Sequence, residues 1–103
     1  MSRPYSKAFI EELYKCDPDM TGTALALACV RANLPANYVA KALEVSRMTM
    51  FSWFRGKPLR HKNLLKVKAF TNLVENDLST GALPAKTVKQ AKEYLQEMVG
   101  RTF

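Results

Sequence analysis

The side chains with the clearest chemical potential in this sequence are arginines and lysines in its middle part. Residues 45–74 contain seven of them and no aspartate or glutamate. They form what we term the basic segment: Arg47, Arg55, Lys57, Arg60, Lys62, Lys66 and Lys68. The nine basic and nine acidic residues elsewhere cancel, so the whole net charge of +7 comes from this segment. Cations without acidic neighbours favour binding to a polyanion such as the phosphates of a nucleic acid.

The alternative interpretation of the basic segment is a solvated, lysine-rich helix surface without a partner. A surface that serves only to keep a protein hydrated usually mixes both signs of charge, and this one does not. His61 falls inside the same segment, and a surface histidine near phosphate is its simplest role. The sequence therefore favours phosphate binding.

Residues that could support catalysis or bind a metal are sparse. His61 is the only histidine, and Cys16 and Cys29 stand thirteen residues apart without a CxxC pair. Zinc ligands occur at short paired spacings, and nucleophilic catalysis needs a base beside the nucleophile; neither pattern is present, nor is a Gly-rich phosphate loop. We therefore expect no enzymatic activity, no cofactor and no metal, with both thiols reduced and buried.

The elements that must position the basic segment begin with two short helices in residues 34–57. Apolar side chains recur there at spacings of three and four, which places them on one stripe of each helix. They are Val39, Leu43, Val45, Met50 and Trp53. Ala40 falls where the helices cross, and its small side chain permits close packing. The spacing predicts two helices facing each other across a tight turn at residues 44–46.

The second helix of this pair, residues 46–55, is predicted to begin at Ser46. The serine hydroxyl can accept a hydrogen bond from the backbone N–H of Met48 or Thr49, as N-cap side chains do. With Trp53 directed inward, the opposite side of the helix forms an outer face. That outer face consists of Arg47, Met48, Phe51, Ser52 and Arg55.

Residues 34–57, and in particular the stretch VAKALEVSRMTMFSWFRGK, resemble the helix-turn-helix domains of the phage repressor and Cro family. The family pattern runs LA, four residues, VSR, then W, two residues and GK. The matching positions include Leu34, Ala40, Val45, Ser46, Arg47, Thr49, Trp53, Gly56 and Lys57. About 24 residues carry the resemblance.

Three residues depart from the family pattern. Ala36 replaces a polar residue, usually Gln, that opens the first helix, and this weakens an expected phosphate or base contact. Glu44 replaces the usual glycine of the turn, which predicts a strained or altered turn. Phe54 replaces the usual glutamate and adds an aromatic ring that is either exposed or differently buried.

The resemblance implies an all-α, compact, five- to six-helix fold like that of lambda repressor, with residues 46–55 in the major groove of double-stranded DNA. Arg47 is then best placed for a bidentate contact with guanine, and Ser52 for a hydrogen bond to a base edge or phosphate. Met48 and Phe51 would contact thymine methyl groups. Phosphate contacts are assigned to Arg55, Lys57, Arg60, His61, Lys62 and Lys66.

The function expected from these features is that of a small transcriptional regulator, a phage-type repressor or activator or an antitoxin-like protein. One helix-turn-helix reads too few base pairs to be selective alone, so we expect a homodimer on a palindromic site. A single domain is expected over residues 1–103, and no small-molecule ligand. No apolar run approaches the roughly 20 residues of a membrane span, and no signal core is apparent, which predicts a cytoplasmic protein.

Four further helices are predicted around this pair. The first covers residues 5–16, capped by Ser6, and is expected either to cover the bundle or to make a dimer contact. The second is capped by Thr21 or Asp19 and ends before a left-handed Asn33. The others cover residues 60–77 and 84–100, the latter ending at Gly100. Tyr94 and Phe103 are left for a contact within the monomer or for a dimer interface.

A protein-interaction module is the competing function. In this alternative, an apolar surface formed by Met48, Phe51 and Phe54 binds a toxin, a host factor or a polymerase. The basic segment opposes it, because seven unpaired cations would then need an acidic partner. The salt dependence of binding to arbitrary duplex DNA distinguishes the two.

Overall fold

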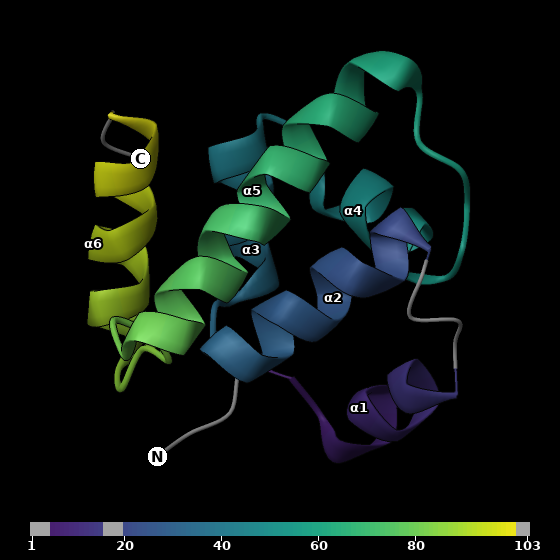
Figure 1. Ribbon diagram of the computed structural model, residues 1–103. Helices are drawn as coiled ribbons and strands as arrows, with labels where there is room; N and C mark the ends of the chain where they lie inside the picture. The colour runs from purple at the N-terminus through teal and green to yellow at the C-terminus, as the bar shows by residue number, and fades with distance from the viewer. Residues whose placement is uncertain (1–4, 16–19, 101–103) are drawn as a thin grey trace.

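All regular secondary structure in the described part of the chain is α-helical. The computed structural model describes residues 5–15 and 20–100. Its helices are α1 (Lys7–Tyr14), α2 (Thr21–Ala32), α3 (Ala36–Leu43), α4 (Arg47–Phe54), α5 (His61–Thr80) and α6 (Val88–Val99) (Figure 1). The expected all-α class is therefore confirmed.

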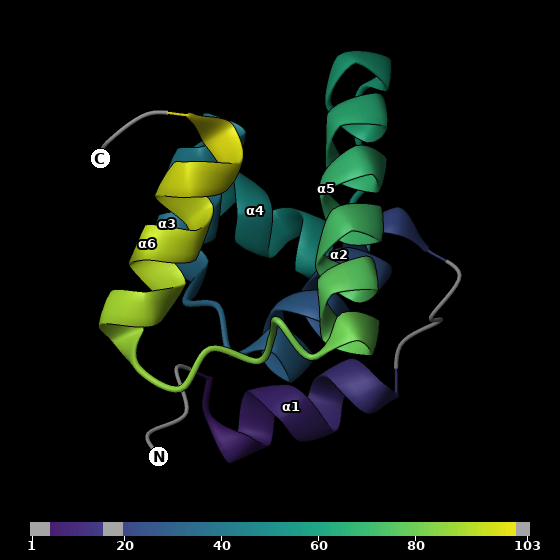
Figure 2. The same ribbon diagram turned by 60° about the vertical axis from the view of Figure 1, so that its left-hand side comes forward.

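The apolar helix α2 occupies the centre of the packing. Its residues Leu25, Ala26 and Cys29 are fully buried, and α1, α4 and α5 all pack against it. Small side chains on α2 allow several helices to approach it at once. Figure 1 shows α5 crossing α2, with α6 set to one side near α3, against which it packs. In Figure 2, α1 lies below α2, on a different side of the molecule from α6.

The long helix α5 contributes the second large part of the core. It ends three residues beyond the predicted Asp77, where Gly81 takes a left-handed conformation with φ 89°. Its buried residues are Val67, Phe70, Thr71 and Val74, which recur at spacings of three and four along one side of the helix.

The first two helices confirm some predicted caps and correct others. Ser6 caps α1 by accepting from the Phe9 N–H at 3.1 Å, but the helix spans Lys7–Tyr14 rather than residues 5–16. Met20 occupies the N-cap position of α2 without a side-chain hydrogen bond, so the prediction of a Thr21 cap was wrong. Asn33 has the predicted left-handed conformation, with φ 60° and ψ 41°. The alternative cap Asp19, like the predicted helical residue Cys16, lies outside the described residues.

Helix α6 begins four residues later than predicted. Thr87 caps it by accepting from the Gln90 N–H at 3.1 Å, and the Gln90 side chain accepts from the Lys86 N–H at 3.0 Å. These two hydrogen bonds, in which the Gln90 side chain reaches the residue before the cap, fix the start of the helix after Pro84 and Ala85. Val88, the first residue of the helix, is exposed, while Ala91 and Leu95 are buried. Gly100 ends the helix in a left-handed conformation, as predicted.

Tyr94 on α6 makes a contact within the monomer. Its hydroxyl donates to Asp77 Oδ2 at 2.5 Å, which ties α6 to the last part of α5. The sequence left open whether Tyr94 and Phe103 make contacts within the monomer or at a dimer interface, and Tyr94 makes a contact within the monomer. Phe103 lies outside the described residues.

The helices form a compact body. Its extents are 30 × 29 × 25 Å and its Cα radius of gyration is 12.6 Å, close to the value of about 13 Å typical of a 100-residue domain. None of the helices in residues 5–15 and 20–100 has the length and apolarity needed to cross a bilayer.

Candidate nucleic-acid interface

The turn between α3 and α4 places a non-glycine residue in a left-handed conformation. Glu44 has φ 59° and ψ 41°, and the Val45 N–H donates to the Ala40 carbonyl at 3.0 Å to close the turn. The predicted strained turn is therefore present, because a residue with a long side chain holds a left-handed conformation. Ser46 then caps α4, accepting from the Thr49 N–H at 3.0 Å, which confirms the predicted cap.

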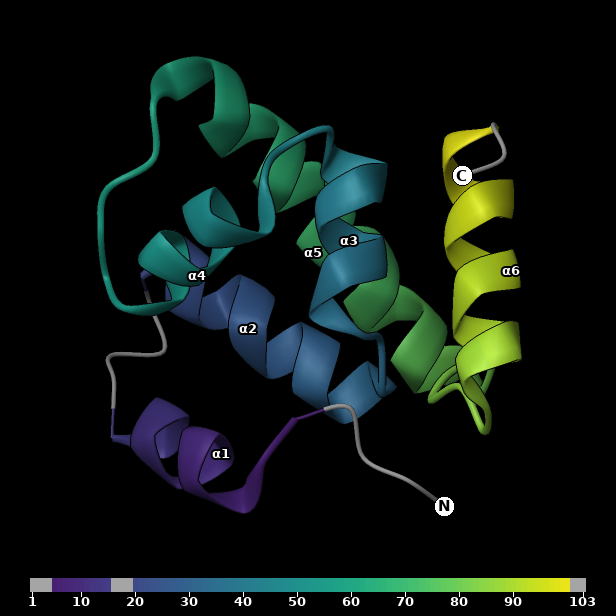
Figure 3. The ribbon, with the colours of Figure 1, turned by 180° about the vertical axis from the view of Figure 1, so that it is seen from behind.

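Helix α4 is held by its inner side. Met50 is fully buried and Trp53 is 4% exposed, as the apolar stripe predicted. Helix α2 crosses α4 at Gly22, where a Cβ would lie 2.1 Å from the carbonyl oxygen of Trp53. No side chain fits at this crossing, so the backbones of the two helices touch. Figure 3 shows α4 lying against α2, with α3 beside it.

The outer face of α4 exposes Arg47, Met48 and Arg55. Met48 is 82% exposed, which is unusual for a large apolar side chain. Ser52 is half-buried, and its hydroxyl donates to the Thr49 carbonyl at 2.6 Å. The Ser52 oxygen therefore remains available mainly as an acceptor, which narrows the contacts that this residue can make with another molecule.

Phe51 differs from its prediction. It was expected as an exposed apolar group of the outer face, but it is half-buried. Its ring meets Phe9 of α1 at a centroid distance of 5.9 Å and Phe54 at 5.3 Å. The guanidinium carbon of Arg47 lies 5.4 Å from the Phe51 ring centroid. Phe51 thus joins α1, α4 and the arginine side chain, a role that the helical spacing alone did not indicate.

Phe54 lies in the core. It is 3% exposed and packs against Phe9 as well as Phe51. The apolar interaction surface that was considered for Met48, Phe51 and Phe54 therefore loses Phe54, and Phe51 contributes only part of its ring. Of the two expectations for this ring, exposed or differently buried, the structure shows burial, because Phe9 of α1 packs against it.

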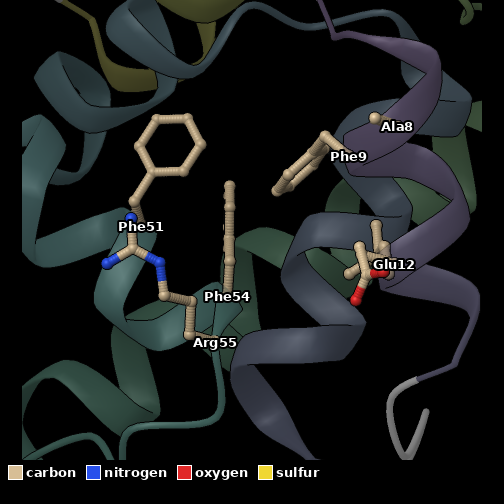
Figure 4. Close-up of a pocket in the computed structure, with 7 residues that line it drawn as sticks. Ala8, Phe9, Glu12, Phe51, Phe54 and Arg55 are labelled. Carbon is tan, nitrogen blue, oxygen red and sulfur yellow. The ribbon is translucent and has the colours of Figure 1, made fainter.

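A groove of about 610 Å³ separates α1 from α4 (Figure 4). Phe51, Phe54 and Leu13 contribute its apolar lining, and Glu12 and Arg55 bring opposite charges to it. A second hollow of about 530 Å³ adjoins it through the shared residues Phe51 and Arg55, and Arg47 and Met48 complete that hollow. The outer face of α4 is thus a concave apolar surface bordered by two arginines.

The basic segment is solvent-accessible. Six of its seven cations are exposed and Lys66 is half-buried. The ion pairs within residues 5–15 and 20–100 are Lys15–Glu12 and Arg31–Glu75, and neither involves the basic segment. Its positive charge is therefore not neutralised by the described acidic side chains.

The connection from α4 to α5 carries the remaining predicted phosphate contacts. Lys57 and Arg60 are exposed there, and His61 and Lys62 are the first two residues of α5. No side chain caps this helix start, where Arg60 is the N-cap residue and no acidic side chain occupies the first turn. An uncapped helix start with cations around it suits an anion.

Two titratable groups lie in the core. Burial raises the pKa of the Cys29 thiol to about 12. Burial also raises the pKa of Tyr5, whose hydroxyl donates to the Leu34 carbonyl at 2.7 Å. Burial therefore favours the neutral form of both groups.

The sequence did not identify Tyr5 and Phe9 as part of this region. Their separation of four residues was the available signal, since rings at that spacing near a helix start can stack. Within the described ranges, no group of three or more His, Cys, Asp and Glu side chains is arranged to hold a metal ion.

The region as a whole combines an exposed helix face, an aromatic-lined groove and an unneutralised basic segment. Comparison of the chain with models of protein families, with curated proteins and with solved structures finds no match.

Proposed function

We propose that this chain is a small transcriptional regulator that binds double-stranded DNA in a sequence-specific manner. In this proposal α3 and α4 form a lambda-repressor-like helix-turn-helix, and α4 enters the major groove. The observation that carries the proposal is the position of the basic segment. Arg47 and Arg55 project from the outer face of α4, and the cations that follow are exposed, apart from the half-buried Lys66, and lack described ionic partners.

Base contacts are assigned to the exposed part of the outer face. Arg47 stands at the start of α4, where a guanidinium can bind the O6 and N7 atoms of guanine. Met48 is exposed enough to contact a thymine methyl group. Ser52 contributes an acceptor, and Phe51 a partly covered ring edge. Of the four residues, Arg47 and Met48 carry most of the proposed sequence selectivity.

Phosphate contacts are assigned to the cations Arg55, Lys57, Arg60, Lys62 and Lys66, and to His61 beside them. These contacts position the protein without reading sequence. Release of counterions from five neutralised phosphates predicts that log K falls with log salt concentration with a slope of about −4 to −5.

A two-fold symmetric homodimer completes the proposal, because a single α4 reads only a few base pairs. Two copies on half-sites about one helical turn apart, or about 10 bp, would supply the missing selectivity. The support is the small size of the reading surface. Tyr94 no longer supports a dimer, because its hydroxyl is satisfied by Asp77.

Selection of bound sequences from random duplex DNA tests the proposal directly. The expected result is a palindromic consensus, with binding that weakens steeply as salt rises. Lys62→Ala should lower the salt slope by about one unit. Lys89→Ala removes one exposed charge from α6, outside the basic segment, and is the matched control that should leave the slope unchanged. Binding that is absent at low salt would contradict the proposal.

A protein-interaction module remains the second candidate because of the groove between α1 and α4. Its volume of about 610 Å³ and its phenylalanine lining suit an apolar side chain of a partner protein. The burial of Phe54 reduces the apolar surface available to such a partner. Binding to a protein with no salt-dependent affinity for arbitrary duplex DNA would favour this function over the first.

A further inference from the structure

We infer that α1 is a positioning element for Arg47, acting through four aromatic rings that connect the start of the chain to the outer face of α4. These rings, Tyr5, Phe9, Phe51 and Phe54, are termed the aromatic cluster. The inference rests on the proposed function, because it assigns to α1 a part in sequence discrimination. It also makes a claim about the free protein that needs no DNA.

The cluster is anchored at Tyr5. This side chain is 7% exposed, and its hydroxyl donates to the backbone carbonyl of Leu34, between α2 and α3, at 2.7 Å. A buried tyrosine with its hydroxyl satisfied has a fixed ring orientation. Phe9 stacks on this ring with a centroid distance of 5.5 Å and an interplanar angle of 21°. The position of Phe9 is therefore set by the α2–α3 connection as well as by α1 itself.

Phe9 in turn fixes the ring of Phe51. The two rings meet edge to face, with centroids 5.9 Å apart and an interplanar angle of 74°. Phe54 meets Phe51 in the same manner, at 5.3 Å and 73°, from within the core. Figure 4 shows Phe9 extending from α1 toward these two rings of α4. Contacts from two directions leave the half-buried Phe51 ring little freedom to rotate away.

The guanidinium of Arg47 lies over this fixed ring, with its carbon atom 5.4 Å from the centroid. The arginine is exposed and has no ion-pair partner in the described parts of the chain, so the ring face is its main orienting contact. A free arginine side chain samples many rotamers and loses that freedom on binding. Holding Arg47 on Phe51 reduces the conformational entropy that the side chain loses on binding DNA. In this way α1 improves the discrimination between base sequences made by Arg47 on α4.

A purely structural role for the aromatic cluster gives different expectations. If Phe9 only stabilised the fold, any equally destabilising core substitution would change DNA binding in the same way. Leu95→Ala provides that comparison, because Leu95 is fully buried on α6 and belongs to no contact of the cluster. Phe9→Tyr is the conservative variant that keeps the ring.

The first experiment measures the Arg47 side-chain NMR signals in the free protein. Because the guanidinium lies over the Phe51 ring, the Arg47 Hδ and Nε–H protons are expected upfield of ordinary arginine values in the wild type and in Leu95→Ala. In Phe9→Ala they should move back toward ordinary values, and Phe9→Tyr should restore the displacement. Ordinary values in the wild type, or unchanged values in Phe9→Ala, would overturn the inference.

The second experiment measures affinity for a selected duplex and for a scrambled duplex, at a temperature where every variant is folded. Phe9→Ala is expected to lower the preference for the selected duplex by about two- to tenfold. The same substitution in an Arg47→Ala background should cause no further loss. Independent, additive losses, or an equal loss of preference in Leu95→Ala, would overturn the inference.

Failure of the inference and failure of the proposed function give different results. A wild-type protein that binds no duplex contradicts the proposed function, and the NMR measurement then decides alone whether α1 orients Arg47. A wild-type protein that prefers its selected duplex, with unchanged preference in Phe9→Ala, supports the proposed function and overturns the role of α1.

Discussion

Gly22 lies directly against the backbone of Trp53, so that a Cβ at position 22 would stand 2.1 Å from the Trp53 carbonyl oxygen and 2.7 Å from its carbonyl carbon. Helices α2 and α4 are therefore joined backbone to backbone at this crossing. The obstacle is a main-chain group of α4 rather than the end of a flexible side chain. Relief of a clash here requires a shift of the helix that carries Arg47.

Gly22→Ala should therefore destabilise the protein by about 1–3 kcal/mol or more, as overpacking of a core does. The helix propensity of alanine would add only about 0.5–1 kcal/mol in the opposite direction. Thermal unfolding measures the difference, with Thr21→Ala at the preceding position as the control, expected to change stability by about 0.5 kcal/mol or less. A higher unfolding midpoint for Gly22→Ala would contradict the close crossing.

Glu44 and Asn33 have nearly the same left-handed conformation and should respond oppositely to glycine. Glu44→Gly should stabilise the fold by about 1 kcal/mol, because a longer side chain is strained in that conformation. Asn33→Gly should destabilise it, because the Asn33 side-chain amide donates to the Ala85 carbonyl at 2.9 Å and asparagine tolerates the conformation. Urea unfolding of both variants tests the pair. A loss of stability in Glu44→Gly would indicate that its side chain contributes more than its strain costs.

Removal of the Glu44 carboxylate should also tighten DNA binding modestly. Glu44 is exposed in the turn immediately before α4, and a negative charge there repels phosphates. The effect should shrink as salt concentration rises, since it acts through solvent.

Arg47→Ala and Lys62→Ala should impair DNA binding in different ways. Arg47→Ala is expected to lose about 1–3 kcal/mol on the selected duplex and much less on unrelated DNA. Lys62→Ala should weaken binding to all sequences alike and reduce the salt slope by about one unit. Titrations of both duplexes at several salt concentrations separate the two results. An equal effect of Arg47→Ala on both duplexes would make Arg47 a backbone contact.

Alkaline pH should destabilise the protein through Cys29. Its folded-state pKa of about 12 exceeds the ordinary value of 9.0, so the folded protein keeps a proton that the unfolded chain loses. The stabilisation is complete below pH 9.0 and is lost as pH rises toward 12, at about 1.4 kcal/mol per pH unit for one group. Urea unfolding measures the free energy of unfolding between pH 8 and pH 10, about one unit on either side of the ordinary thiol pKa. This free energy should depend less on pH in Cys29→Ala than in the wild type.

The local features of the chain were predictable because each depends on neighbouring residues. The cap at Ser46, the left-handed Asn33 and the burial of Met50 and Trp53 follow from turn chemistry and helical spacing. The late start of α6 was also encoded nearby, in the Thr87 and Gln90 pair, but Pro84 was the more conspicuous signal.

The contacts around α4 were not predictable in the same way. Helical spacing gives the side of α4 on which Phe51 and Phe54 lie, but not which other element packs there. Both rings are covered because Phe9 of α1 packs against them. The close helix crossing at Gly22 could not be predicted either, because the group that excludes a side chain there is the carbonyl of Trp53, 31 residues away on another helix. The exposed cations of the basic segment needed no such knowledge, since charge patterning alone indicated a solvent-facing surface.

The hydrogen bond from Tyr5 to Leu34 also bears on the stage of folding at which α1 forms. It joins residues 29 apart in the chain, and the surface that receives α1 is made by α2, α4 and the connection before α3. An eight-residue helix does not persist alone in water, so α1 acquires its helical hydrogen bonds only when that surface already exists. Helix α1 should therefore dock last and detach first. Its amide protons should exchange with solvent through local opening, whereas those of α2 should exchange only through global unfolding.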